Sequence, residues 1–241
     1  MGYAIRTENL IKRYKDKTAV DGLTLSVNEG ELIALLGVNG AGKTTTVRML
    51  TCLTRPSGGK AEIMGIDITK DPDRVKRLVG VSPQDTSVAE NLTVKENLEF
   101  MAGICLPKDK TEAAAAKAIE AFGLEEFKNK KAKLLSGGYK RKLSIAMAVI
   151  GEPKVLFLDE PTLGLDVLAR RQLWREIEAL RKNMTIVLTT HYMEEAEALA
   201  DRIVIMNEGR IMAVVTLAEL EDMTGKKGLE DVFVSIAERT E

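Results

Sequence analysis

The sequence predicts an α/β fold with a mainly parallel sheet, an antiparallel β subdomain and an inserted helical subdomain. Leu173, Ile177 and Leu180 recur with the spacing of a helix that buries one face. This helix lies between two apolar runs, and strand, helix, strand in this order indicates parallel pairing. Continuous apolar runs predict strands covered by helices on both faces, and they occur at residues 32–36, 155–158, 186–188 and 203–206.

The beginning and the middle of the chain follow other patterns. Leu23, Leu25 and Val27 alternate with polar residues, and this period of two predicts a strand of an antiparallel sheet with one buried face. Between residues 91 and 150 the pattern indicates helices and no strand. We therefore expect one domain over residues 1–241, and its predicted parts are an α/β core (1–84 and 151–220), a helical subdomain (85–150) and a C-terminal tail (221–241).

Composition and charge narrow the class of protein. The chain has 241 residues, of which 45% are hydrophobic and 29% charged, as in ordinary soluble globular proteins. The 35 Lys and Arg residues nearly balance the 36 Asp and Glu residues, so we expect no nucleic-acid partner. Cys52 and Cys105 have no CxxC spacing and there is one histidine, which excludes the usual zinc sets and a disulfide framework and favours a cytoplasmic setting.

A phosphate-binding motif stands between a predicted strand and a predicted helix. Residues 37–44 match G-x-x-x-x-G-K-[ST], in which the lysine neutralises the outer phosphates and the Thr44 hydroxyl can bind Mg²⁺. The alternative is a glycine-rich turn without a ligand. The probability that the motif matches by chance in a chain of this length is on the order of 1%. The motif predicts a P-loop NTPase core, and the residues expected to bind the nucleotide are Gly37, Asn39, Gly40, Ala41, Gly42, Lys43 and Thr44.

Three polar residues follow predicted strands at the edge where ligands of open α/β sheets bind. Asp159 and Glu160 come directly after the run at 155–158. An aspartate there can bind Mg²⁺, and an adjacent glutamate can orient and deprotonate an attacking water. Adjacent acids are otherwise typical of a solvated turn, but the apolar run before them favours the functional interpretation. His191 follows another predicted strand, so we expect it to contact the terminal phosphate rather than to be purely structural.

A second anion-binding device is predicted at the start of another helix. Ser136, Gly137 and Gly138 precede apolar residues with helical spacing. The serine could simply cap the helix. A serine with two glycines at a helix N-terminus also binds anions, however, and the chain already has one such device. Two devices for one nucleotide suggest that each belongs to a different subunit.

With these residues in place, the sequence resembles the nucleotide-binding subunit of an ATP-binding cassette (ABC) transporter over nearly its whole length. The serine-glycine-glycine segment resembles the family signature, and its position between the phosphate loop and the acid pair makes the resemblance specific. The resemblance extends the phosphate loop to Thr45 and implies that Tyr14 stacks on adenine. It further implies that Gln84 reaches Mg²⁺ and the attacking water, that Asp166 belongs to a subunit-contact loop, and that His191 is the switch histidine.

One residue of the signature departs from the family pattern. Tyr139 stands where the family usually has glutamine, although its hydroxyl can still form a hydrogen bond. Residues 139–142 and 229–233 resemble the ABC-2 exporter branch, which includes multidrug, antibiotic-resistance and sodium-extrusion systems. This places the expected activity among ATPases that drive export.

The resemblance implies a mechanism with ATP and Mg²⁺ as cofactors. Two copies, or one copy and a related ATPase subunit, would pack head to tail, each ATP lying between the phosphate loop of one copy and Ser136, Gly137 and Gly138 of the other. Hydrolysis with Glu160 as general base would drive export through separate transmembrane permease subunits, with this chain at the cytoplasmic face of the cell membrane.

Two other classes of protein remain as alternatives. A soluble ABC-type ATPase, acting on DNA breaks or ribosomes, usually has long coiled-coil insertions or two cassettes in one chain. This sequence shows neither a sustained heptad pattern nor a repeat. The other alternative is a P-loop kinase that phosphorylates a small acceptor. The signature and the acid pair both argue against this class.

Overall fold

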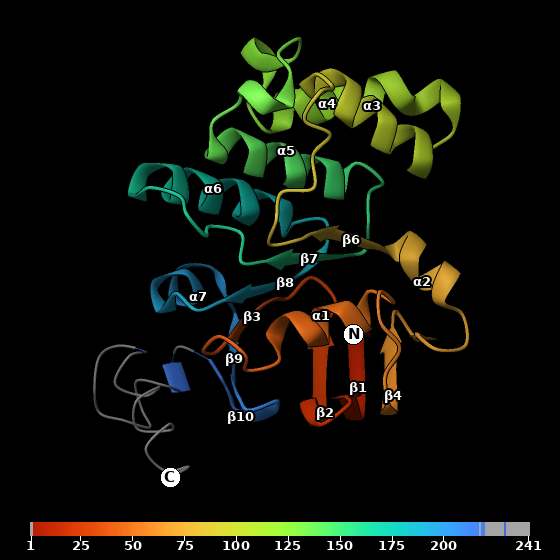
Figure 1. The fold of residues 1–241 in the computed structure, drawn as a ribbon, viewed down its shortest axis with the longest axis vertical. Coiled ribbons are helices and arrows are strands. Elements are labelled where there is room, and N and C mark those ends of the chain that lie inside the picture. The colour runs from red at the N-terminus through yellow and green to blue at the C-terminus, as the bar shows by residue number, and fades with distance from the viewer. Residues whose placement is uncertain (1, 217, 220–228, 230–241) are drawn as a thin grey trace.

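The computed structural model describes residues 2–216, 218–219 and 229. Its larger sheet has six strands in the order β10-β9-β3-β8-β7-β6 (Figure 1). The four pairs from β9 to β6 are parallel, and β10 runs antiparallel to β9. The predicted α/β fold with a mainly parallel sheet is confirmed. The strands are β3 (Leu32–Leu36), β6 (Val79–Ser82), β7 (Val155–Asp159), β8 (Thr185–Thr190), β9 (Arg202–Asn207) and β10 (Arg210–Val215).

The smaller sheet is antiparallel and contains the strand expected from the alternating pattern. Its order is β2-β1-β4-β5, and Leu23, Leu25 and Val27 all point into the core from β2. The sequence did not single out β1 or β4. The four strands are β1 (Tyr3–Tyr14), β2 (Lys17–Asn28), β4 (Gly58–Ile63) and β5 (Ile66–Asp67).

Helices cover both faces of the larger sheet, which explains its continuous apolar runs. On one face, α1 (Lys43–Leu50) lies between the two sheets and shares a hydrophobic cluster with both, to which Ile33 and Phe157 belong. On the other face, Leu32 and Leu156 pack in a cluster with the helical region. The helices that contribute side chains to this second cluster are α3 (Val94–Cys105), α4 (Thr111–Ala121), α5 (Gly137–Val149), α6 (Val167–Leu180) and α7 (Met193–Leu199).

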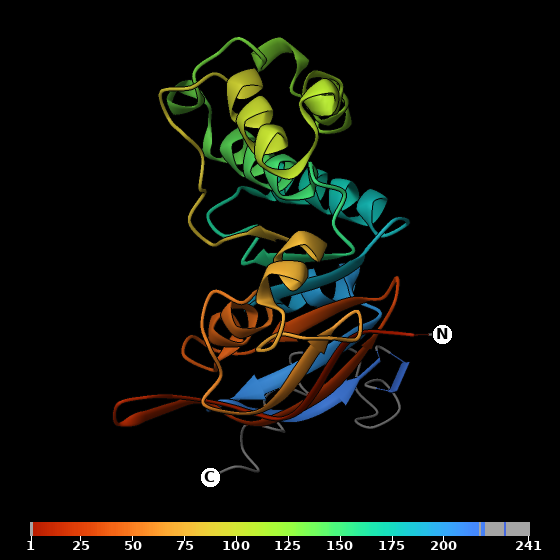
Figure 2. The same ribbon diagram turned by 90° about the vertical axis from the view of Figure 1, so that its right-hand side faces the viewer.

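The middle of the chain forms the helical region that was expected there. Residues 91–150, all described, contain α3, α4, α5 and three short 3₁₀ turns, with one isolated bridge between Thr93 and Lys131. Thr93 and Glu96 form a capping box that fixes the start of α3. Figures 1 and 2 show α3 and α4 at one end of the molecule and the antiparallel sheet at the other.

The end of the chain is only partly described. Residues 210–215, which fall within the predicted α/β core, form β10 at the edge of the larger sheet. The predicted tail at 221–241 lies outside the described residues except for Leu229, which is buried and donates its backbone N–H to Glu197. Within the described residues, no helix has both the length and the apolar character that crossing a membrane requires.

The contact between β1 and β4 provides a test of the smaller sheet. Gly59 has φ +77°, and a Cβ there would lie 2.1 Å from the carbonyl oxygen of Asn9. Gly65 has a similar φ of +72° with no atom within 4 Å. We expect Gly65→Ala to lower the free energy of unfolding by about 1 kcal/mol through left-handed strain alone. Gly59→Ala adds overpacking and should cost about 3 kcal/mol or more.

Urea unfolding followed by the fluorescence of Trp174, the single tryptophan, measures both glycine variants. Equal losses of stability at the two positions would contradict the close β1–β4 contact.

Candidate functional site

Five predicted site residues come together at the edge of the larger sheet where β3, β7 and β8 end. They are Lys43 and Thr44 at the start of α1, Asp159 at the end of β7, and Glu160 and His191 directly after β7 and β8. Lys43 Nζ lies 3.5 Å from Glu160 Oε1. The other carboxylate oxygen of Glu160 lies 2.6 Å from His191 Nδ1. Next to them, the Thr44 hydroxyl donates to Asp159 Oδ1 at 3.1 Å. This cluster (Lys43, Thr44, Asp159, Glu160 and His191), the loop cluster, unites residues more than a hundred positions apart.

Glycines give the phosphate loop a shape that other residues would not allow. A Cβ at Gly37 would lie 2.4 Å from the carbonyl oxygen of Met206. Gly42 has φ +101° and stands immediately before α1. The Lys43 side chain folds back over the loop and donates to the carbonyl of Gly37 at 2.7 Å. The loop therefore holds its cation above backbone that is shaped to surround an anion.

The loop residues differ in exposure. Gly37, Ala41, Gly42 and Lys43 are buried and Thr45 is half-buried. The predicted loop residues that are exposed, and that a ligand can therefore reach, are Asn39, Gly40 and Thr44.

Asp159 and Thr44 supply the kind of oxygen atoms that Mg²⁺ prefers. Asp159 is buried, and its Oδ1 also accepts from the Thr189 hydroxyl at 2.5 Å. Mg²⁺ is usually bound by one or two protein oxygens together with substrate phosphates. The hydroxyl and the carboxylate side by side suit that chemistry. No group of three or more His, Cys, Asp or Glu residues that could bind a metal occurs among the described residues.

Glu160 is held in a specific orientation by its surroundings. Its φ of 50° is unusual for a residue other than glycine. Its backbone N–H donates to the Thr189 carbonyl and hydroxyl. A carboxylate only accepts hydrogen bonds, so His191 donates through Nδ1. Among the described residues, none forms a hydrogen bond with the other imidazole nitrogen, Nε2.

The remaining predicted residues stand in other loops and at the ends of other elements. Tyr14 is exposed at the end of β1, with Lys12 Nζ 4.8 Å from its ring centroid. Gln84 is exposed in the loop after β6. Asp166 caps α6 by accepting from the backbone N–H of Leu168 and Ala169, both at 2.9 Å. The described structure records no contact between these side chains and the loop cluster.

The signature segment also lies apart from the loop cluster. Ser136 caps α5, its hydroxyl accepting from the Tyr139 N–H at 3.5 Å. Gly137 begins α5, and both glycines leave this helix start free of side chains. A Cβ added at Gly138 would make ordinary contact with Ala169 and Leu165. The two predicted anion-binding devices of this chain begin helices on opposite faces of the larger sheet, α5 on one face and α1 on the other.

Sequence reasoning missed a buried arginine beside the loop cluster. Arg141 on α5 is 4% exposed, and burial lowers its pKa to about 10, against the opposing effects of Asp159, Glu195 and Glu160. The guanidinium therefore remains charged at neutral pH. In the sequence it lies among Lys140 and Lys142, a pattern typical of a solvated helix face.

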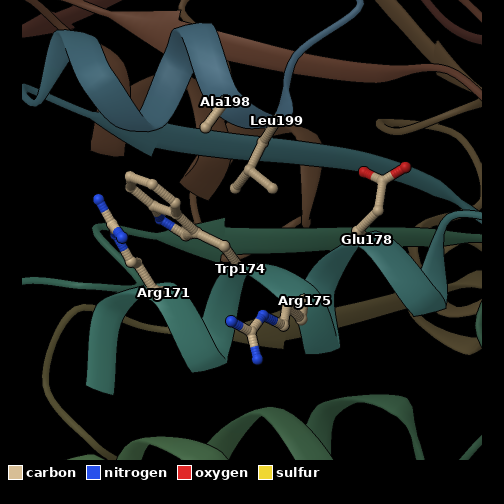
Figure 3. A pocket seen from close by; sticks show the side chains of 6 residues that line it. All are labelled: Arg171, Trp174, Arg175, Glu178, Ala198 and Leu199. Carbon is tan, nitrogen blue, oxygen red and sulfur yellow. The ribbon is translucent and has the colours of Figure 1, made fainter. Parts of the chain in front are cut away.

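A buried carboxyl on α7 was missed as well. Glu195 of α7 is fully buried, and Trp174 Nε1 donates to its Oε1 at 3.2 Å. Burial raises the pKa of Glu195, and the nearby Glu160 charge adds to this, while Thr190, Thr162 and Trp174 lower it. Figure 3 shows Trp174 between α6 and α7, beside Leu199. None of the predicted site residues lines the hollow drawn there.

The fold and the loop cluster define a P-loop nucleoside triphosphatase. The family model described as "ABC transporter" matches residues 20–163. The chain is 44% identical to the daunorubicin/doxorubicin resistance ATP-binding protein DrrA of Streptomyces peucetius, over 94% of this chain and 69% of that protein. The chain therefore belongs to the ABC transporter family.

Solved structures support this assignment. A structure of an ATP binding subunit of an ABC transporter superposes with a TM-score of 0.86 at 30% identity, covering 97% of this chain and 99% of that one. The dimeric post-hydrolysis state of the ATP-binding cassette MJ0796, bound to ADP and Pi, gives a TM-score of 0.80 at 25% identity over 88% and 98%. The protein is an ABC ATPase, the ATP-binding subunit of an exporter-type transporter. The predicted family and enzyme class are confirmed, and the transporter interpretation is favoured over a soluble ABC-type ATPase.

The buried carboxyl of Glu195 predicts a pH-dependent stability. The pKa of Glu195 is raised above the ordinary value of 4.5. The stability that Glu195 contributes to the fold is therefore present below pH 4.5 and is lost as the pH rises toward the folded-state pKa. Glu195→Gln keeps an oxygen that accepts from Trp174 and replaces the titratable carboxyl by an amide that does not titrate. Between pH 5 and pH 8 we expect this variant to gain stability over the wild type by up to about 1.4 kcal/mol per pH unit.

Urea unfolding at several pH values measures this gain. Glu194→Gln, at the exposed neighbouring position, should follow the wild type. Parallel curves for Glu195→Gln and the wild type would contradict a raised pKa of Glu195.

Proposed function

We propose that two copies of this chain bind two ATP molecules head to tail and hydrolyse them to drive export through separate permease subunits. The contact of Glu160 with both Lys43 and His191 carries this proposal, because it joins a phosphate-loop cation, a candidate base and a second phosphate contact. The proposal keeps the division into an α/β core (1–84 and 151–220), a helical subdomain (85–150) and a tail.

Lys43 would change partners when ATP binds. It now donates to the carbonyls of Gly37 and Val38 and pairs with Glu160. The β- and γ-phosphate oxygens of ATP offer stronger, charge-assisted bonds. Release from the lysine would free one Glu160 oxygen to accept a proton from the attacking water. The bond from His191 Nδ1 would keep the other oxygen in place, with Nε2 directed to the γ-phosphate.

Mg²⁺ would be bound by Thr44 and Asp159, with Gln84 as a further ligand, and would neutralise charge on the phosphate oxygens. The hydrogen bond between Thr44 and Asp159 supports this assignment because it brings the two oxygen ligands together beside the loop. Tyr14 is exposed, and its ring would stack on adenine.

The separate placement of the two anion-binding devices supports a dimer. In one chain, Ser136 lies at the start of α5 and the phosphate loop precedes α1, on opposite faces of the sheet. A twofold arrangement lets each ATP contact the phosphate loop of one copy and Ser136, Gly137 and Gly138 of the other, which satisfies both devices with closed symmetry. Asp166, at the start of α6, would contribute to the contact between copies.

A groove on the helical side offers a surface for the permease. It has a volume of about 560 Å³ and lies between α3, α5 and β6. Met101, Ile104 and Met147 give it an apolar wall, and Lys76 and Arg77 of α2 (Pro72–Leu78) form a basic rim. Gly80 and Pro83, close to Gln84, also line it. A cytoplasmic permease helix with an apolar face and an acidic end would suit this groove, and would place the protein at the cytoplasmic face of the cell membrane.

Replacing the proposed base tests the site directly. Glu160→Gln keeps shape and polarity but cannot accept the proton, so hydrolysis should slow at least about a hundredfold. ATP affinity should stay within about threefold, and the ATP-bound dimer should accumulate in gel filtration. Lys43→Ala is the matched control, because it removes a charged phosphate contact and should weaken ATP binding about tenfold or more. Wild-type turnover by Glu160→Gln would refute its role as base.

Charge placed in the groove tests the permease surface. Ile104 is 64% exposed, and we expect Ile104→Glu to weaken binding to native membrane vesicles stripped of peripheral proteins about tenfold, or about 1.4 kcal/mol. ATP binding in solution should not change. Tyr3→Glu, exposed on β1, is the control and should bind like the wild type. Unchanged vesicle binding by Ile104→Glu, or equal binding to protein-free liposomes, would contradict this docking surface.

A further inference from the structure

The guanidinium of Arg141 donates its hydrogen bonds to backbone carbonyl groups rather than to carboxylates. Its Nη1 donates to Pro83 O at 2.5 Å and to Gln84 O at 3.2 Å. Its Nε donates to Pro161 O at 2.8 Å, and its Nη2 donates to Asp159 O at 2.6 Å. Among the salt bridges between described residues, none involves Arg141. One side chain of α5 thus holds two separate loops.

Both loops carry residues of the proposed hydrolysis site. The carbonyls of Asp159 and Pro161 stand on either side of Glu160. Glu160 has a left-handed backbone with φ 50°, which costs on the order of 1–2 kcal/mol and persists only where the surroundings enforce it. Arg141 fixes the peptide group that precedes Glu160 and the one that follows Pro161. The same guanidinium holds the carbonyl of Gln84, so it sets the distance between the two loops.

The chemistry of arginine suits this task better than that of lysine. A guanidinium offers five N–H donors in a rigid planar fork, whereas an ammonium offers three donors around a point. Four carbonyls in different directions require the fork. Lys142, the next residue, makes an ordinary buried pair with Glu176 at 2.5 Å. The two neighbours on α5 therefore have different roles.

We propose that Arg141 is a positioning residue that fixes Glu160 relative to Gln84 and links both to the helix that Ser136 caps. This inference rests on the proposed function. In a head-to-tail dimer each chain gives Ser136 to one ATP site and Glu160 to the other. Arg141 lies five residues after Ser136 on the same helix, so a shift of this helix on contact with one ATP moves the backbone that presents Glu160 at the second ATP. Arg141 thus connects the two sites through one chain.

The test compares Arg141→Lys with Arg202→Lys. Arg202 on β9 is a matched control, because it also donates to a carbonyl, that of Ser26 at 2.6 Å, and pairs with Glu31. It stands at the start of its strand, whereas the loop cluster lies where the parallel strands end. We expect Arg141→Lys to lower kcat about tenfold or more, with KM for ATP within about threefold and a Hill coefficient that falls to 1. Arg202→Lys should keep the kcat, KM and Hill coefficient of the wild type.

Chemical rescue separates positioning from a general loss of structure. Arg141→Ala leaves room for a guanidinium ion, and guanidinium chloride at about 10 mM, far below denaturing concentrations, should restore part of its kcat. Arg141→Met fills the space and should not respond. If Arg141→Ala does not fold, the comparison of the two lysine variants alone decides. Wild-type kcat and Hill coefficient in Arg141→Lys, or the absence of rescue in a folded Arg141→Ala, would overturn the proposal.

The two proposals fail in distinguishable ways. If Glu160→Gln hydrolyses ATP like the wild type, the proposed function fails and the positioning role fails with it. If Glu160→Gln is inactive while Arg141→Lys matches the wild type in kcat and cooperativity, only the role of Arg141 fails.

Discussion

The contacts of Glu160 with Lys43 and His191 are the constraint on which the rest of the site depends. A buried carboxylate is stable only when its charge is paired and its oxygens accept hydrogen bonds. Here one oxygen lies near the lysine and the other accepts from the imidazole. The three residues follow different strands, so the contacts require β3, β7 and β8 to end together. The parallel register of these strands provides that alignment.

The sequence predicts the parts of the fold in which pattern and environment agree. The apolar runs of β3, β7, β8 and β9 are continuous because helices or the second sheet cover both faces. In β1 the register shifts at several points and Asn9 has φ 47°, so its alternation is broken. In β6 the strand is short and contains Gly80, where a Cβ would lie 2.2 Å from the Ala148 carbonyl oxygen. Close packing therefore requires a glycine at this position, and a glycine weakens the sequence pattern that predicts a strand.

The candidate site likewise contains residues that the sequence predicts and residues that it does not. Motif and strand ends predicted the loop cluster, because a phosphate loop and strand-terminal polar residues must meet at one edge of a parallel sheet. Arg141 and Glu195 could not be found from the sequence, since charged residues on helices are mostly exposed. Their function depends on the carbonyls and the indole that the fold brings to them. The capping bonds of Ser136 and Asp166 likewise appear only in the structure.

The most direct measurement is a crystal structure of the protein with a non-hydrolysable ATP analogue and Mg²⁺. We expect a twofold dimer in which Ser136 of the partner subunit lies within hydrogen-bond distance of the γ-phosphate bound to this chain's phosphate loop. A nucleotide bound at Lys43 with the start of α5 of every copy far from it would contradict the head-to-tail dimer.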